Sequence, residues 1–346
     1  MKTVFSPDHA LHHPLNELSD GTLVPAVEIP SRADMVLAAV TAAGLGAVVA
    51  PDPLDEALLR RVHAPDYVDF LDGFWDRWLA EGRKGAEALP FCFPTRGFSQ
   101  HVPDHLDGAL GHYAFDAGTP VGPGTARAAR ASASVAASGA ALIAGGDKLA
   151  FSLCRPPGHH AMPDQFGGYS FFNNAALAAE TLRDASAGRV AILDVDYHHG
   201  NGTQAIFYDR SDVFFTSIHA DPREEYPYFL GHAGETGNGP GEGATLNLPL
   251  PKGTLAATWF AALETALAAI TRHGAEALVV SLGVDAYEGD PISHFKLASQ
   301  DFSRLGERLG AIGLPTLYVM EGGYAVEAIG TNVANVLTGH AAALPG

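Results

Sequence analysis

Cysteine is scarce in this sequence, and so are basic residues and long apolar runs. Two cysteines in 346 residues cannot form the disulfide framework that stabilises small secreted proteins. The 21 lysines and arginines are outnumbered by 39 aspartates and glutamates, which gives a formal net charge of −18. A chain this acidic repels phosphate backbones and anionic lipid surfaces, so we expect neither a nucleic-acid partner nor a membrane partner.

No segment has the features of a membrane helix or of a secretion signal. The longest apolar stretch, residues 36–50, is interrupted by Thr41, Gly44 and Gly46 and falls short of the ~20 residues that a membrane helix needs. Residues 1–8 lack the apolar core of a signal peptide. These features predict a cytoplasmic protein. The acidic composition also suits small cationic partners, although solubility alone would explain it.

Short apolar runs alternate with segments of helical periodicity along most of the chain. Continuous apolar runs are typical of parallel strands that helices cover on both faces. The pattern predicts a single α/β domain over residues 1–346, with one open, mostly parallel sheet flanked by helices. The expected strands are Thr3–Phe5, Ala47–Ala50, Leu149–Leu153, Val190–Val195, Val213–Ile218, Leu278–Leu282 and Thr316–Met320. The expected helices include 31–43, opened by a capping box at Ser31–Asp34, and 125–143, 258–273 and 300–312.

One region, residues 82–124, breaks this alternation. It holds five prolines and many glycines and shows little periodicity. A loop of that length inside a compact domain is usually functional or forms an interface. We therefore interpret it as a long loop insertion within the single domain.

Polar side chains follow the ends of several expected strands. Ligands of open parallel sheets bind beyond the carboxyl ends of the strands, where these side chains would meet. The sequence therefore predicts an active site at that edge, with candidates His159, His160, Asp196, His198, Asp285 and Tyr324.

The segment Asp194-x-Asp196-x-His198 is the strongest candidate for a metal site. Alternate residues of a strand share one face, so the three side chains point the same way. Carboxylate and imidazole groups suit a divalent ion, and burying them without a partner would be costly. Asp285 follows another apolar strand and is a candidate third ligand, but a lone aspartate there could equally be a cap or turn residue.

Hydrolysis at a metal centre also needs groups that move protons and stabilise an oxyanion. His159 and His160 follow a Pro-Pro-Gly turn that fixes their backbone direction, although adjacent histidines can also be a surface accident. Tyr324 follows two glycines, which allow a close turn of the chain. It is either an oxyanion donor or a buried packing tyrosine.

Five ordered motifs resemble those of the histone deacetylase superfamily, which has the arginase/deacetylase fold. They are Arg-Pro-Pro-Gly-His-His (155–160), Gly-Gly-Tyr-Ser-Phe-Phe-Asn-Asn (167–174), Asp-Val-Asp-Tyr-His-His-Gly-Asn-Gly-Thr-Gln (194–204), Ser-Leu-Gly-Val-Asp (281–285) and Met-Glu-Gly-Gly-Tyr (320–324). The resemblance extends from about residue 4 to 338. Within the superfamily, the flanking segments are most similar to the bacterial acetylpolyamine amidohydrolases.

The resemblance implies one zinc ion, held by Asp196, His198 and Asp285. The sequence leaves open whether zinc, Fe²⁺ or another divalent ion is bound. The related arginase-type enzymes hold two manganese ions and need two further aspartates. Gly200 and Tyr287 stand at those positions, which argues against a second metal ion.

The resemblance also implies roles for the polar residues around the metal. His159 and His160 form the histidine pair, with His160 as general base and acid, and Tyr324 polarises the substrate carbonyl. Asp194 orients His159, and its backbone carbonyl contributes to a structural K⁺ site. Asn201 stands where many relatives have an aspartate beside the second histidine.

The resemblance further implies an acyl tunnel. Gly168, Tyr169 and Tyr226 match residues that line it in relatives. A polycationic substrate needs carboxylates beyond the tunnel, and the favoured candidates are Glu17 and Asp107, followed by Asp116.

The expected function is zinc-dependent hydrolysis of N-acetylated polyamines or diamines to the free amine and acetate. The insertion at 82–124 is expected to form a homodimer that narrows the active-site mouth. A protein acetyl-lysine deacetylase with the same mechanism is the first alternative. A catalytically silent metal-binding or interaction protein is a more distant one.

Overall fold

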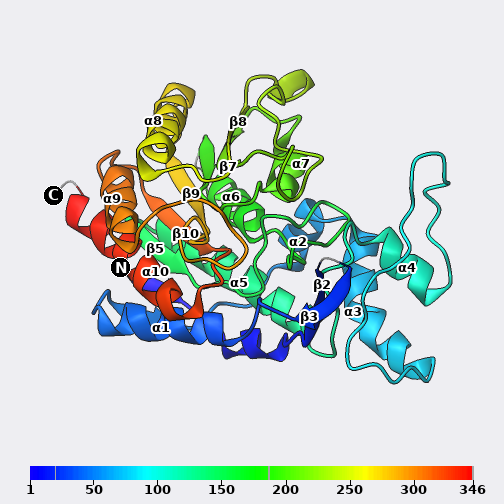
Figure 1. Ribbon diagram of the computed structural model, residues 1–346. Coiled ribbons are helices and arrows are strands. Elements are labelled where there is room, and N and C mark those ends of the chain that lie inside the picture. Colours follow the sequence, from blue (N-terminus) through cyan, green and yellow to red (C-terminus); the bar gives the residue numbers. More distant parts are fainter. Residues whose placement is uncertain (20, 186–187, 345–346) are drawn as a thin grey trace.

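A central sheet of eight parallel strands organises the computed structural model, which describes residues 1–19, 21–185 and 188–344 (Figure 1). The strand order is β4-β1-β5-β10-β9-β6-β7-β8. The strands are β1 (Lys2–Val4), β4 (Ala47–Val49), β5 (Leu149–Ser152), β6 (Val190–Asp194), β7 (Val213–Ala220), β8 (Thr245–Leu250), β9 (Ala277–Leu282) and β10 (Thr316–Met320). The predicted α/β class with one open parallel sheet is confirmed.

Helices cover both faces of the sheet, and each face has its own apolar core. Neighbouring side chains on a strand point to opposite faces, so Ile192 lies in one core and Leu193 in the other. One face is covered by α2 (Glu56–Val62), α3 (Pro65–Ala80), α5 (Thr125–Ala144) and α6 (Asn174–Asp184), and the other by α1 (Ser31–Ala42), α8 (Ala256–His273), α9 (Ser299–Gly310) and α10 (Val326–Ala343). The short helices are α4 (Leu106–His112), α7 (Asn201–Phe207), η1 (Pro7–Leu11) and η2 (Gly239–Gly241).

Three strands were not predicted. β8 is an edge strand, where Pro249 is tolerated and where fewer side chains are buried, so its apolar pattern is weak. The other two, β2 (Asn16–Ser19) and β3 (Thr22–Pro25), pair only with each other as an antiparallel hairpin. These two strands lie outside the central sheet and are mostly not buried. Their residues therefore do not form the continuous apolar run by which a buried strand is predicted.

Helix α1 begins differently from the prediction. Pro30, and not Ser31, is the N-cap residue, and no side chain caps the helix. Pro30 already has helical backbone angles (φ −53°, ψ −36°), as its ring favours. The expected capping box at Ser31 is therefore wrong.

The insertion at 82–124 is mostly irregular and contains α4. Ala88 and Val121 form a two-way backbone bridge, with both N–O distances 2.9 Å. This bridge closes the base of the loop, while α4 and its neighbouring segments extend away from the sheet (Figure 1). Among the described residues, no helix is long and apolar enough to cross a membrane.

Candidate functional site

Asp196, His198 and Asp285 meet beyond the carboxyl ends of the neighbouring strands β6 and β9. One possible ligand atom from each lies within 4.8 Å of the other two, and all three residues are buried. The Nδ1 atom of His198 is 3.4 Å from Asp196 Oδ1 and 3.2 Å from Asp285 Oδ2. The structure thus brings together the three predicted metal ligands.

The electrostatics of this group suit a cation. Burial, together with the neighbouring Asp196 carboxylate, raises the pKa of Asp285 to about 8. Burial also acts to raise the pKa of Asp196, but His159 and His198 hold it below its usual value. A divalent ion between the two carboxylates would offset their repulsion, so the donor set fits a metal ion.

Two glycines leave room for the Asp196 carboxylate. A Cβ atom at Gly283 would lie 2.0 Å from Asp196 Oδ2, and one at Gly322 would lie 2.5 Å from the same oxygen. The Gly322 N–H donates to that oxygen at 2.8 Å. Any side chain at either position would displace the candidate ligand.

The adjacent histidines have different partners. His159 Nδ1 lies 2.9 Å from Asp194 Oδ2, and His160 Nδ1 lies 2.7 Å from Asn201 Oδ1. Burial opposes protonation of both rings, but Asp194 and Asp196 raise the pKa of His159 to about 10. The pKa of His160 is well below its usual value because of burial and the neighbouring His159. The fold therefore favours a protonated, charged His159 ring and a neutral His160 ring.

Tyr324 lies on the loop that follows β10. Asp290 and Arg32, which the sequence did not single out, contact this loop. The backbone N–H of Tyr324 donates to Asp290 Oδ2 at 2.7 Å. The Arg32 guanidinium lies 4.7 Å from the centre of the Tyr324 ring and donates to the Gly323 carbonyl at 2.6 Å. Arg32 is itself paired with the buried Glu28 carboxylate at 2.7 Å. These contacts fix the ring of Tyr324 beside the candidate metal site.

Tyr169 and Tyr226 lie on two sides of the site. The Tyr226 ring centre is 5.1 Å from that of His160 and 6.2 Å from that of His198. The Tyr169 ring centre is 5.7 Å from that of Tyr324. The predicted aromatic walls therefore flank the catalytic candidates.

Gly168 and Asp116 position these walls. A Cβ atom at Gly168 would lie 2.2 Å from the His160 ring, and its φ of 54° also favours glycine. One Asp116 oxygen accepts from the Gly168 N–H at 2.6 Å and from the Tyr226 hydroxyl at 2.7 Å. Asp116 thus links the insertion to both sides of the site, a role that the sequence did not suggest.

The two favoured amine-binding acids lie in different places. Glu17 accepts from the Tyr169 hydroxyl at 3.1 Å and from the Val27 N–H at 3.1 Å, and burial raises its pKa. Asp107 lies on α4, in the part of the insertion that extends away from the sheet, and pairs with Arg83 (Figure 1). The structure brings Glu17 to the candidate site and does not bring Asp107 there.

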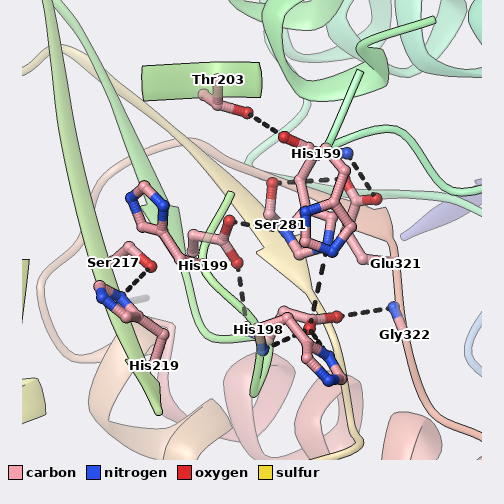
Figure 2. Close-up of polar contacts among 12 residues, drawn as sticks. His159, His198, His199, Thr203, Ser217, His219, Ser281, Glu321 and Gly322 are labelled. Carbon is pink, nitrogen blue, oxygen red and sulfur yellow. Dashed lines mark hydrogen bonds and ion pairs between the residues drawn. The ribbon is translucent and has the colours of Figure 1, made fainter. Parts of the chain in front are cut away.

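Glu321 is a buried residue whose role the sequence did not reveal. Its carboxylate accepts from the Gly158 N–H at 2.7 Å. It also accepts from the His159 N–H at 3.1 Å, and Ser281 Oγ is 3.3 Å away (Figure 2). Burial is the main cause that raises its pKa to about 7. Its place in the Met-Glu-Gly-Gly-Tyr motif was the only available signal.

The family model described as "Histone deacetylase domain" matches residues 26–340 of this chain. The chain belongs to the histone deacetylase family. Two relatives in this family cover 98% of the chain: acetylpolyamine amidohydrolase 2 of Pseudomonas aeruginosa, 57% identical over 98% of its length, and the acetylpolyamine amidohydrolase of Mycoplana ramosa, 53% identical over 99% of its length. The predicted family is confirmed.

Solved structures of histone deacetylase family members share the fold. The crystal structure of the acetylpolyamine aminohydrolase from Burkholderia pseudomallei has a TM-score of 0.95 and 39% identity, with complete coverage of both chains. The HD domain of HDA15 has a TM-score of 0.83 and 28% identity, covering 100% of this chain and 90% of its own. The eight-stranded parallel sheet is therefore the family fold.

Proposed function

We propose that this histone deacetylase family member is a metal-dependent amidohydrolase that removes the acetyl group from N-acetylated polyamines or diamines. The observation that carries the proposal is the buried Asp196–His198–Asp285 group, with a histidine pair and Tyr324 beside it. The full-length similarity to proteins named acetylpolyamine amidohydrolases supports the substrate class.

We assign zinc as the metal, held by Asp196, His198 and Asp285, because one imidazole and two carboxylates suit it. The same donors accept Fe²⁺ or another divalent ion, and metal analysis of the purified protein decides between them. When bound, such an ion polarises the acetyl carbonyl and lowers the pKa of a water molecule. A structural K⁺ ion near the Asp194 carbonyl stays a prediction.

His160 is the proposed general base and acid. Because Nδ1 faces the Asn201 amide oxygen, Nδ1 carries the proton and Nε2 is free to accept one. Nε2 takes the proton of the attacking water and gives it to the leaving nitrogen as the C–N bond breaks. Acetate and the free amine are then released. His159, held by the Asp194 carboxylate, supplies positive charge beside the developing oxyanion.

The aromatic residues are proposed to hold and orient the acetylated end of the substrate. Tyr324 donates a hydrogen bond from its hydroxyl to the acetyl oxygen, which gains negative charge in the transition state. Tyr169 and Tyr226 enclose the methylene chain, with Gly168 leaving space for His160. Glu17, at the hydroxyl of Tyr169, adds negative potential for a cationic amine.

We also propose that the chain forms a homodimer through the insertion at 82–124. Phe91 and Phe98 on this loop are 70% and 65% exposed, which gives a second copy of the chain two large apolar side chains to cover. A role for Asp107 in amine binding would require such a partner, because in one chain it pairs with Arg83. The single domain over residues 1–346 and the cytoplasmic location also stay predictions.

Deacetylation of protein acetyl-lysine is the second candidate, supported by the histone deacetylase domain match. Steady-state kinetics of the zinc-loaded protein separate the two, with acetylputrescine, acetylcadaverine, acetylspermidine, an acetyl-lysine peptide and an acetylated folded protein as substrates. We expect the highest kcat/KM on a small acetylated amine. A higher value on the folded protein would favour the second candidate, and no acetate from any substrate would favour a silent metal-binding protein.

A further inference from the structure

The loop between β7 and β8 (yellow-green in Figure 1) carries two solvent-exposed aromatic side chains, and ring contacts connect them to the candidate site. Tyr228 is 52% exposed and Phe229 is 85% exposed. Among the described residues, no large apolar side chain is more exposed than Phe229. A single exposed aromatic residue needs no explanation, but two in sequence beside an active site suggest a ligand.

A row of rings joins these two residues to the catalytic candidates. The Tyr226 ring centre lies 5.1 Å from that of His160 and 6.3 Å from that of Tyr228. The Tyr228 ring centre lies 6.5 Å from that of Phe229. A substrate chain that leaves the buried histidine along Tyr226 therefore reaches Tyr228 and then Phe229.

The loop that carries these rings is anchored at both ends. Before them, Glu225 pairs with Lys252. After them, the Gly231 N–H donates to Glu235 at 2.8 Å, and the Gly231 carbonyl lies 2.8 Å from His219 Nε2. The exposure of the rings is thus a feature of a fixed loop.

The backbone of Tyr228 is strained. Its φ of 65° lies in the left-handed region, which residues other than glycine seldom adopt. Such strain persists only where surrounding contacts impose it, and it is concentrated at ligand clamps and active sites.

The charge around the loop suits a cation. The arginine and the lysine nearest in sequence or contact, Arg223 and Lys252, are paired with Asp221 and Glu225. They therefore do not oppose an incoming positive charge. The whole chain has a net charge of −18, which attracts cations.

We propose that Tyr228 and Phe229 form an aromatic lip that binds a distal ammonium group of the acetylated amine by cation–π contact. The faces of aromatic rings attract ammonium groups within about 6 Å of the ring centre. The proposal rests on the proposed function, because it places the acetyl group between His160 and Tyr324. It makes the lip a specificity determinant that selects a charged chain over a neutral chain of the same length.

The test uses Phe229→Leu, which keeps apolar bulk but removes the ring, and Phe229→Trp, which keeps a ring. Each zinc-loaded variant is assayed on acetylputrescine and on N-butylacetamide, a neutral analogue with the same methylene chain. For Phe229→Leu we expect kcat/KM on acetylputrescine to fall about two- to fivefold, the usual effect of an exposed cation–π contact. N-butylacetamide should lose clearly less, and Phe229→Trp should restore the preference for the charged substrate.

Equilibrium binding tests the aromatic lip independently of whether the protein hydrolyses the substrate. The Kd values of both compounds are measured by titration calorimetry on the slow Tyr324→Phe variant, with and without Phe229→Leu. A weaker Kd for acetylputrescine alone supports the lip even if no acetate is released from any substrate, a result that would contradict only the proposed function. Equal changes for the two compounds, or none for acetylputrescine, would overturn the lip. A change in the oligomeric state of Phe229→Leu, with equal losses on both substrates, would also overturn the lip. Phe229 would then lie in an interface between copies of the chain.

Discussion

The backbone N–H of Tyr324 donates to Asp290, and its ring contacts Arg32. Neither contact uses the hydroxyl group, so removing that group should leave the loop in place. We predict that Tyr324→Phe lowers kcat about 10²- to 10³-fold, because one oxyanion donor is lost. The zinc content and the melting temperature should stay near those of the parent protein. The measurement is kcat at saturating acetylputrescine together with zinc per chain. Near-normal turnover would make Tyr324 a packing residue.

Asp285 is the candidate ligand whose negative charge the metal-free fold tolerates least. We predict that Asp285→Asn removes most of the bound zinc and nearly all activity, because three ligands leave no redundancy. Adding zinc should raise the melting temperature of the parent protein but not of the variant. Elemental analysis and thermal unfolding check this, with Asp107→Asn as the control on α4. Full zinc occupancy in Asp285→Asn would contradict the ligand assignment.

His63 should make stability depend on pH. Its Nδ1 is 3.0 Å from the Met162 carbonyl and its Nε2 accepts from the Asn173 N–H at 2.9 Å, so the ring is held neutral. Burial lowers its pKa from 6.5 to about 4. The unfolded chain therefore takes up this proton first as pH falls. The stability is fully present above pH 6.5 and is lost as pH falls toward about 4.

We predict that this single ring contributes a slope of about 1 kcal/mol per pH unit to the free energy of unfolding in that range. Denaturant titrations at several pH values measure the slope, which should be shallower in His63→Gln. His105, whose side chain is 73% exposed, provides the control as His105→Gln. Identical slopes for the two variants would show that His63 is not the group responsible.

The sequence predicts the metal candidates better than the residues that support them. Asp196 and His198 lie two residues apart just beyond β6, so their short separation in the sequence keeps them together, although the strand alternation expected for them ends at Asp194. The contact of Arg32 with the Gly323 carbonyl joins residues 291 positions apart, and no local pattern reveals such a pair. Asp107 is predicted to bind an amine because of its negative charge. In the structure this charge is paired with Arg83, a contact that the sequence does not reveal.

At the scale of elements, α5 packs unusually close to the sheet at Gly139. A Cβ atom there would lie 2.1 Å from Ser152 Oγ on β5 and 2.8 Å from a Leu317 methyl group on β10. Alanine favours a helix over glycine by about 1 kcal/mol, but overpacking a core costs about 1–3 kcal/mol. It would also disturb the buried bond from Ser152 Oγ to the Val135 carbonyl.

We therefore predict that Gly139→Ala lowers the free energy of unfolding by up to about 2 kcal/mol, the packing cost less the gain in helix propensity. The matched control is Gly73→Ala in α3, where no atom lies within 4 Å of the new methyl group. That change should stabilise the protein by up to about 1 kcal/mol. Urea unfolding of both variants measures the difference. A shift of the same sign in both would mean that helix propensity, and not packing, decides the outcome at Gly139.

The elements that the sequence predicts are those buried on both faces. β6, β9 and β10 have only buried residues, and their continuous apolar runs match the predicted strands to within one residue. β8 and the β2–β3 hairpin are partly exposed, so solvent permits many residue types along them. Glu17 enters the site from this hairpin, which explains why sequence periodicity could not place it.

At the scale of the whole molecule, the net charge of −18 should act on substrate binding. We predict that KM for acetylspermidine rises several-fold as ionic strength increases from about 0.01 M to about 0.15 M, because salt screens exposed charges. KM for N-butylacetamide should change little over the same range. Parallel titrations with sodium chloride measure both. The same rise for both compounds would indicate an effect of salt on the protein and not on attraction of the cation.

The position of β10 has a consequence for how the chain is made. It lies between β5 and β9 in the middle of the sheet, yet it is the last strand in sequence. During synthesis, every earlier strand leaves the ribosome while this central place is empty, and β5 and β9 each expose an unpaired edge. Unpaired edges promote association between chains, and distant strand pairing is slow. We therefore expect the nascent chain to be most prone to association before β10 is made, and Tyr324 reaches the site only after that strand.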